Sequence, residues 1–209
     1  MFDYFHERLP LHVFGPIAAA LALPAQAAAP FGAVRFIADT AFAFLLLAQF
    51  RLWDDLADRD ADAERHPHRA LVRARSIRGP AALCVALGVL NAVVVLQRQR
   101  AQIGAPLLGV LTVALMCVYS PAFGLRASAR EARSTPGLER QRWQPALKDL
   151  LRLSKYPAFV MLVAIGRRGN SLQLASSAAV AAYAAACAYE LWHDDTTALR
   201  RLFRSPSCR

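Results

Sequence analysis

Apolar residues along the chain fall into six long runs separated by polar segments. Such runs predict membrane-spanning helices, because a helix needs about 20 apolar residues to cross the hydrocarbon core of a bilayer. The expected spans are residues 11–29, 33–53, 79–97, 101–121, 154–167 and 171–192. The fifth run is short, and the mixed-polarity segment "LKDLLRLSK" before it would have to extend it. The pattern predicts an all-α, multi-pass transmembrane helical bundle with about six spans.

The composition favours a membrane protein over a soluble one. Hydrophobic residues make up 56% of the chain and the mean hydropathy is +0.28, which is unusual for a soluble domain. The runs are rich in Ala and Leu, as in helices that pack closely in lipid. A soluble helical bundle is the alternative, since such bundles also have Ala-rich cores. The placement of charge argues against this alternative.

Basic residues are distributed very unevenly between the two sides of the predicted bundle. With six spans, the N-terminus, loops 51–78 and 122–153 and the tail after residue 192 share one side. With Lys155 assigned to the same interface, that side carries 20 of the 25 Lys and Arg residues, and the other side carries 5. By the positive-inside rule, both termini and both long loops are expected in the cytoplasm of a bacterial-type inner (plasma) membrane. The net charge of +10 then reflects topology and anionic lipid, so no nucleic-acid partner is required.

An acidic stretch, "DDLADRDADAE" at residues 54–64, follows the second predicted span and holds six of the chain's fifteen carboxylates. On a continuous helix Asp55, Asp58 and Asp62 share one face, because they stand at i, i+3 and i+7. These like charges need cations to offset their repulsion. The basic side chains of the same segment are Arg51, Arg59, Arg65 and Arg69.

Two interpretations of the acidic stretch follow. The first is a solvated helix end in which the Asp residues pair with those arginines. The second is a divalent metal site. Hard oxygen ligands without cysteine indicate Mg²⁺, which commonly bridges carboxylates to substrate phosphates. No CxxC or Cys/His spacing is present, so neither a zinc site nor a disulfide framework is predicted.

The acidic stretch resembles a motif of the UbiA superfamily of intramembrane prenyltransferases. That family carries N/D-D-x-x-D-x-x-x-D at the cytoplasmic end of its second helix, followed by a basic segment of the type R-x-P-x-R-P-L. This chain has "DDLADRDAD" at residues 54–62 and "RHPHRAL" at residues 65–71, in the same position relative to the second span. Asp54 stands where the family commonly has Asn, and Ala70 where it usually has Pro.

Two later segments extend the resemblance. "YSPAFGLR" at 119–126 is similar to the family's Tyr-Ser-Pro segment, which would put Tyr119 and Arg126 at the mouth of the pocket. The alternative is that "SP" simply ends a helix and Arg126 marks the cytoplasmic interface. Lys148 and Lys155, in the next loop, are further candidates for phosphate binding.

The second acidic motif of the family is matched only in part. The chain offers "CAYELWHDDTTALRRLF" at residues 187–203, where Glu190 and Asp194 are i, i+4 neighbours. They would supply the second face of the metal site. The alternative is a helix N-cap at Asp195 or Thr196 that starts a last amphipathic helix.

The resemblance implies a function. Residues 1–209 would form one UbiA-like transmembrane domain, C-terminally shortened, lacking about the last three of the family's roughly nine helices. It would transfer a prenyl group from an isoprenoid diphosphate to a small acceptor, which is aromatic in much of the family, with Mg²⁺ as cofactor. The implied metal ligands are Asp54, Asp55, Asp58, Asp62, Glu190 and Asp194. The implied catalytic residues are Asp55, Asp58, Asp62 and Arg69. The implied substrate-binding residues are Arg65, Tyr119, Arg126 and Lys148.

Two non-catalytic alternatives remain open. One is a degenerate family member that binds isoprenoid phosphates or a partner protein, which the missing helices favour and the intact first motif opposes. The other is an unrelated membrane scaffold, which requires the acidic spacing to be chance. A homo-oligomer is compatible with each of these.

One acidic residue lies inside a predicted span. Asp39 is expected to form a snorkelling interface pair with Arg35 at i−4, in preference to a proton relay. At about 1.5 Å per residue it lies roughly 24 Å from Asp55, too far to share the acidic site.

Overall fold

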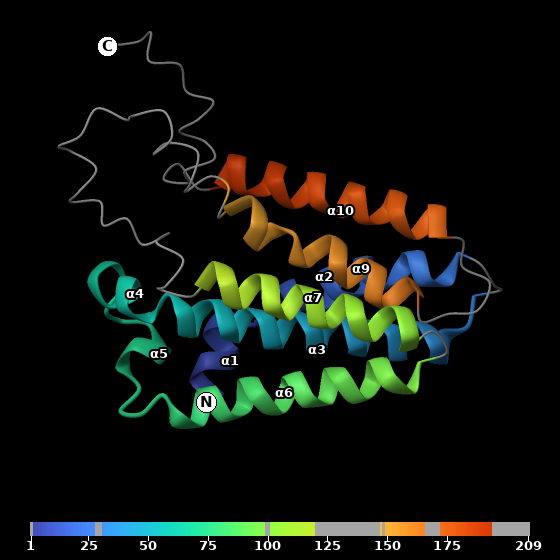
Figure 1. The fold of residues 1–209 in the computed structure, drawn as a ribbon. Helices are drawn as coiled ribbons and strands as arrows, with labels where there is room; N and C mark the ends of the chain where they lie inside the picture. The colour runs from blue at the N-terminus through green and yellow to red at the C-terminus, as the bar shows by residue number, and fades with distance from the viewer. Residues whose placement is uncertain are drawn as a thin grey trace, which may run out of the picture.

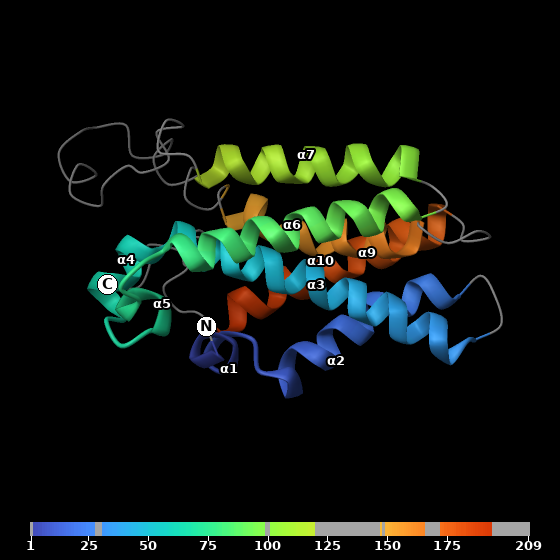
Figure 2. The same cartoon turned by 90° about the horizontal axis from the view of Figure 1, so that it is seen from below.

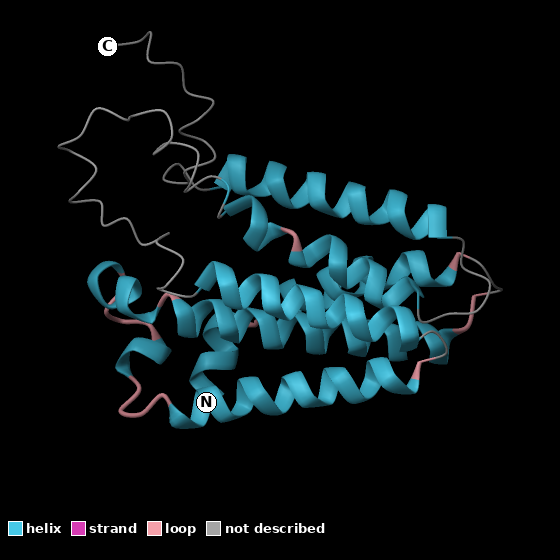
Figure 3. Ribbon diagram, viewed as in Figure 1, coloured by secondary structure: helices cyan, strands magenta, loops and turns pink. Residues whose placement is uncertain are grey.

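Every regular element in the described part of the chain is a helix (Figures 1 and 3). The structure is a computed structural model, and it describes residues 2–27, 31–98, 101–119, 147, 149–165 and 172–193. In chain order the elements are α1 (Phe2–Arg8), α2 (Leu11–Ala22), η1 (Leu23–Gln26), α3 (Ala33–Ala57), α4 (Arg59–Arg65), α5 (Ala70–Arg73), α6 (Arg78–Gln97), α7 (Ala101–Tyr119), α9 (Lys155–Ile165) and α10 (Leu172–His193). The all-α prediction is confirmed for these residues.

Among the described residues, four helices are long and apolar enough to cross a membrane. They are α3 with 25 residues, α6 with 20, α7 with 19 and α10 with 21 in its apolar part. At 1.5 Å per residue even the shortest is about 28 Å long, close to the thickness of a bilayer's hydrocarbon core. These helices coincide with the predicted spans 33–53, 79–97, 101–121 and 171–192.

The other two predicted spans are shorter, and the structure does not confirm them as spans. In place of 11–29, α2 has 12 residues, and in place of 154–167, α9 has 11. The α-helical geometry of α2 gives way to the 3₁₀-helix η1, which has Pro24 in its first turn. Proline has no N–H to donate and restricts the backbone, so it favours such a change. Residues 149–153 are helical and precede α9, as the mixed-polarity segment before it suggested.

Helix α3 lies at the centre of the bundle (Figures 1 and 2). It packs against α2, α6 and α9, while α7 packs against α6 and α9, and α10 lies mainly on α9. Phe50 of α3 and Phe159 of α9 are almost completely buried, with ring centroids 5.2 Å apart. Because α3 is central, the residues at both of its ends lie close to the neighbouring helices.

The outward faces of the long helices are apolar, and polar groups lie between them. Val85 on α6, Val110 on α7 and Val180 on α10 are 67%, 67% and 69% exposed. Between α6 and α3, the buried Asn91 donates Nδ2–H to Oε1 of Gln49 at 2.7 Å. Apolar residues outside with polar contacts inside are typical of helices that pack in lipid.

One end of the bundle gathers the short charged helices, and we call it the polar end. Figure 1 shows α1, α4 and α5 at the end where α3, α7 and α10 finish and where α9 begins. Ten of the twelve Lys and Arg residues in the described part belong to segments at this end. The other two, Arg35 and Arg98, lie at the opposite end.

Asp39 marks that opposite end, and its surroundings differ from the expected interface pair. The side chain is completely buried, and it accepts hydrogen bonds from Nη2 of Arg98 and Nε2 of Gln26, each at 2.8 Å. Arg98 also donates Nη1–H to the Val163 carbonyl at 2.8 Å, and its guanidinium lies 4.3 Å from the Phe42 ring centroid. The sequence did not indicate these partners, since Arg98 comes from 59 residues away to join α6, α3 and α9; the expected pairing of Asp39 with Arg35 stays a prediction.

We expect Arg98→Met to destabilise the protein strongly. The change removes the guanidinium from a buried carboxylate, and breaking one side of a buried ion pair costs about 3–5 kcal/mol. The free energy of unfolding in mixed micelles measures this effect. Arg78→Met, at the exposed start of the same helix, is the matched control and should change stability by less than about 0.5 kcal/mol. Equal effects of the two substitutions would contradict the assigned role of Arg98.

Candidate functional site

The acidic stretch begins inside α3 and continues after a break in the helix. Asp54 and Asp55 lie in the last turn of α3, which runs beyond the predicted end at residue 53. At Asp58 the backbone leaves helical geometry (φ −94°, ψ 4°), and α4 starts at Arg59. Aspartate favours helix ends over helix interiors, because its side chain competes for backbone hydrogen bonds. The expected stripe of carboxylates on one continuous helix is therefore wrong.

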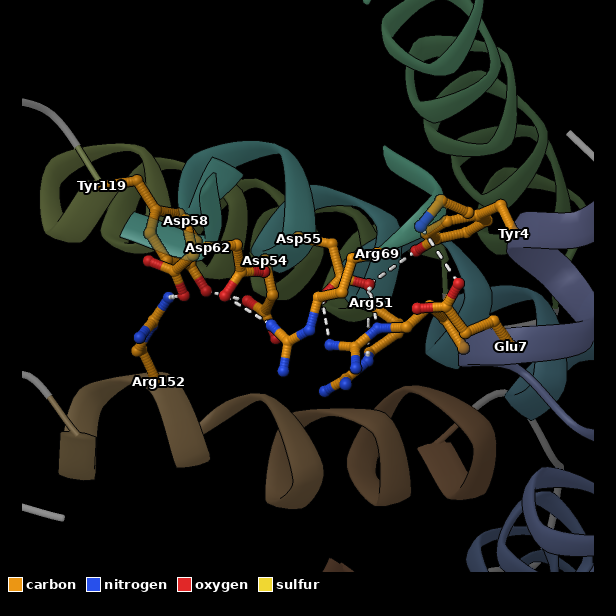
Figure 4. A network of polar contacts seen from close by, with 12 residues as sticks. Tyr4, Glu7, Arg51, Asp54, Asp55, Asp58, Asp62, Arg69, Tyr119 and Arg152 are labelled. Atoms are coloured by element: carbon orange, nitrogen blue, oxygen red, sulfur yellow. Dashed lines mark hydrogen bonds and ion pairs between the residues drawn. The ribbon is translucent and has the colours of Figure 1, made fainter. Parts of the chain in front are cut away.

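Asp55 is the most enclosed carboxylate of the stretch, with 6% exposure. The hydroxyl of Tyr4 donates to Oδ2 at 2.9 Å, and Arg8 donates Nε–H to Oδ2 at 3.0 Å and Nη2–H to Oδ1 at 2.6 Å. Nε of Arg51 lies 3.7 Å from Oδ2. These contacts tie α1 to the end of α3, so the N-terminal helix forms part of the site (Figure 4).

Both α1 side chains at Asp55 have shifted pKa values. Burial, followed by the charge of Asp55 and its hydrogen bond, raises the pKa of the Tyr4 hydroxyl well above its ordinary value of 10.0. Burial lowers the pKa of Arg8, but the hydrogen bond and charge of Asp55 outweigh it, and the net shift is upward. Tyr4 thus stays a neutral donor and Arg8 a cation.

Each of the other motif carboxylates contacts its own basic side chain. Asp54 accepts hydrogen bonds from Nζ of Lys155 and from the hydroxyl of Tyr119.

Asp58 accepts from Nη2 of Arg152, and Asp62 forms an ion pair with Nη1 of Arg69. Figure 4 shows these charged side chains side by side between the acidic stretch and the helix that carries Arg152.

Together these side chains line one cavity of about 230 Å³, which we call the polar cavity. Six carboxylates line it: Asp54, Asp55, Asp58, Asp62, Asp149 and Glu190. Five basic side chains line it as well: Arg8, Arg51, Arg69, Arg152 and Lys155. Basic side chains can bind the anionic oxygens of a ligand, and carboxylates can bind a metal cation that accompanies it. A cavity lined by both therefore suits an anionic ligand with a bound cation.

A second, larger hollow of about 770 Å³ runs along the bundle, and we call it the apolar groove. Its walls are α2, with Val13, Phe14 and Ile17, and the alanine-rich face of α10. Along α10 it extends from Ala178 to Glu190, which is about 18 Å at 1.5 Å per residue. Arg8, Arg51, Leu153, Tyr156 and Glu190 line both hollows, so the polar cavity and the groove meet.

The structure brings most of the predicted site residues together. The cavity-lining residues among them are Asp54, Asp55, Asp58, Asp62, Arg69, Lys155 and Glu190. Tyr119 reaches the site through its bond to Asp54. Arg65 does not line the cavity and is exposed, since it ends α4. Arg126, Lys148 and Asp194 lie outside the described residues.

The sequence interpretation missed Tyr4, Arg8, Asp149 and Arg152 as site residues. Asp149, Arg152 and Lys155 follow one another at intervals of three in a leucine-rich segment, and this spacing was the available signal. Tyr4 and Arg8 also share a helix face at i, i+4, but nothing local indicates that this face packs on residue 55.

The metal site stays a prediction. Within residues 2–193, apart from the gaps given above, no three His, Cys, Asp or Glu side chains gather in a way that would hold a metal ion. The motif carboxylates instead face Arg and Lys.

No protein-family model, curated protein or solved structure matches this chain. The resemblance to the UbiA superfamily therefore stays a prediction from the quoted motifs. The features of the structure that bear on function are the polar cavity, the apolar groove and their junction.

The buried tyrosine predicts a pH-dependent stability. Because the folded-state pKa of Tyr4 is raised, its contribution is present below its ordinary value of 10.0 and is lost as the pH rises above it. In that range the unfolded chain releases a proton that the folded chain keeps, which costs about 1.4 kcal/mol per pH unit. Tyr4→Phe should show a shallower loss of stability between pH 10 and 11.5, measured by denaturant unfolding. Equal slopes for the variant and wild type would contradict the buried neutral hydroxyl.

Proposed function

We propose that the protein is an intramembrane prenyltransferase that moves a prenyl group from an isoprenoid diphosphate to a small aromatic acceptor, with Mg²⁺ as cofactor. The observation that carries the proposal is the junction of the charged cavity with the long apolar groove. A ligand with a compact anionic head and a hydrocarbon tail matches this pair of hollows in shape and polarity. The UbiA-like motif at residues 54–71 supports the same ligand class.

The donor chemistry of the polar cavity fits a magnesium diphosphate, although its described arrangement does not gather the ligands. Hard carboxylate oxygens are what Mg²⁺ prefers, and the guanidinium groups suit phosphate oxygens. Asp54, Asp58 and Asp62 would hold the metal, with Asp55, Glu190 and Asp194 as the remaining ligands that the resemblance implies. When bound, Mg²⁺ would neutralise charge on the departing diphosphate.

The chain's own residues supply positioning and electrostatic stabilisation. In the transfer, the allylic C–O bond breaks and its electron pair leaves with the diphosphate, where Arg69, Arg152 and Lys155 stabilise the negative charge. The walls of the apolar groove hold the tail and keep water from the allylic cation. The acceptor then forms the new bond to carbon and releases its proton.

A second candidate is a catalytically degenerate protein that binds isoprenoid phosphates or a partner protein. It is favoured by the fact that each of the four motif carboxylates contacts a Lys or Arg side chain of the chain itself. Both candidates use the same ligand-binding hollows, and they differ in metal dependence and in transfer.

We further propose six crossings of an inner (plasma) membrane, with the polar end in the cytoplasm. α2 with η1 and α9 with residues 149–153 would be the two short crossings. The concentration of described basic residues at the polar end supports this orientation.

The orientation predicts where Cys208 is accessible. A membrane-impermeant maleimide should label Cys208 only after the membrane is permeabilised, because both termini are expected in the cytoplasm. Cys208→Ser is the control that identifies the labelled residue. Labelling of Cys208 in intact cells would contradict the topology.

The metal role predicts different outcomes for neighbouring aspartates. Purified wild type should bind farnesyl diphosphate more tightly with Mg²⁺ than with EDTA, and Asp58→Asn or Asp62→Asn should abolish this difference. The same two variants should lower transfer from radiolabelled farnesyl diphosphate to a panel of aromatic acceptors by at least about 100-fold.

Asp60→Asn is the matched control, since Asp60 belongs to the same stretch but is exposed and does not line the polar cavity. It should behave as wild type in binding and transfer. If wild type binds farnesyl diphosphate equally with and without Mg²⁺ and transfers the prenyl group to no acceptor, the enzyme proposal is contradicted. The degenerate binding protein is then the favoured function.

A further inference from the structure

Asp55 differs from Asp58 and Asp62 in how completely its oxygens are used, and it is the most buried of the motif carboxylates. Both oxygens accept hydrogen bonds from the α1 side chains Arg8 and Tyr4, at 2.6–3.0 Å. Asp58 and Asp62 each contact one arginine, and the Asp58 side chain is 38% exposed. A metal would have to displace a buried, multiply bonded cation from Asp55, but only a single arginine from Asp62.

Arg8 lies where the two hollows meet. Its side chain is 18% exposed and lines both the polar cavity and the apolar groove. The guanidinium carries five N–H donors, and its contacts with Asp55 use only Nε and Nη2. The remaining donors are available to an anion placed at the junction.

The helix that carries Arg8 is fixed at several points. Tyr4 is buried in a cluster with Leu52 of α3 and Leu71 of α5. Glu7 accepts a hydrogen bond from the backbone N–H of Ala70 at 3.0 Å. Arg8 is therefore presented by an ordered helix, and Asp55 sets the direction of its guanidinium plane.

We propose that Asp55 is a positioning residue for Arg8 rather than a metal ligand, and that Arg8 binds the phosphate next to the hydrocarbon tail of the ligand. The class of ligand, a phosphate-headed amphiphile, rests on the proposed function. Arg8 lines the place where the polar cavity meets the apolar groove. It would therefore favour ligands whose phosphate group is bonded directly to a hydrocarbon tail. This assignment divides the acidic motif between two tasks, with Asp54, Asp58 and Asp62 left for the metal.

The test measures two kinds of binding on the full chain in detergent micelles. Binding of radiolabelled farnesyl diphosphate is measured in EDTA, and Mn²⁺ binding without lipid is measured by electron paramagnetic resonance. Arg8→Gln and Asp55→Asn should each weaken farnesyl diphosphate binding in EDTA by at least tenfold. The double variant should be no weaker than the worse single variant, because the two residues act as one unit. Arg75→Gln, an exposed arginine outside both hollows, is the charge-matched control and should bind as wild type.

The metal measurement separates the two roles of the motif. Asp55→Asn should keep Mn²⁺ binding within about twofold of wild type, whereas Asp62→Asn should lose it. Loss of Mn²⁺ binding in Asp55→Asn to the extent seen in Asp62→Asn would overturn the inference. Wild-type affinity for farnesyl diphosphate in Arg8→Gln, or additive effects in the double variant, would also overturn it.

Two other results also have a defined meaning. If Asp55→Asn does not fold, Arg8→Lys is measured in its place, because lysine keeps the charge of arginine but not its planar group of donors. An affinity for farnesyl diphosphate between those of wild type and Arg8→Gln supports the inference, and a loss as large as that of Arg8→Gln overturns it. If wild type binds farnesyl diphosphate but no Mn²⁺, the magnesium role fails while the Arg8 result still decides the inference. Failure of wild type to bind farnesyl diphosphate at all would overturn both.

Discussion

A carboxylate buried at the end of an apolar helix must be in contact with a cation, and much of this structure depends on that requirement at Asp55. Arg8 and Tyr4 meet it from α1, which brings the N-terminal helix against the end of α3. Arg98 meets the same requirement at Asp39, near the other end of α3. The central helix is thus held at both ends by ion pairs with partners far away in the sequence, in a bundle whose outward faces are apolar.

The same requirement shapes the polar end into a binding site. The acidic motif contacts basic side chains from α1, from the residue before α5, and from the segment that leads into α9. These charges enclose a cavity instead of a solvent-exposed helix end. Because α10 presents mostly alanine to α2, a long groove remains between them and opens into that cavity. The paired charges thus form a polar cavity, and the small side chains leave an apolar groove. The two hollows match the polar head and the hydrocarbon tail of an amphiphile.

The periodicity of apolar residues was sufficient to predict α3, α6, α7 and α10, since length and hydropathy alone define such helices. It predicted spans at 11–29 and 154–167, where the structure describes α-helices of 12 and 11 residues, with Pro24 in the first turn of the 3₁₀-helix that follows α2. Local spacing located the carboxylates but did not indicate that the helix is interrupted at Asp58. The partners Arg8 and Arg152 lie 47 and 94 residues from their carboxylates, and no local pattern reports contacts over such separations.

The central claim is that one amphiphile occupies the polar cavity and the apolar groove at the same time. Photo-crosslinking with a farnesyl diphosphate analogue that carries a diazirine at the end of its tail tests this most directly, with the modified residues identified by mass spectrometry. The account predicts labelling of α2 and α10 at groove-lining positions such as Ile17 and Ala178, and its suppression by excess unlabelled farnesyl diphosphate. Labelling confined to outward-facing residues such as Val89 and Val110, unchanged by the competitor, would contradict it.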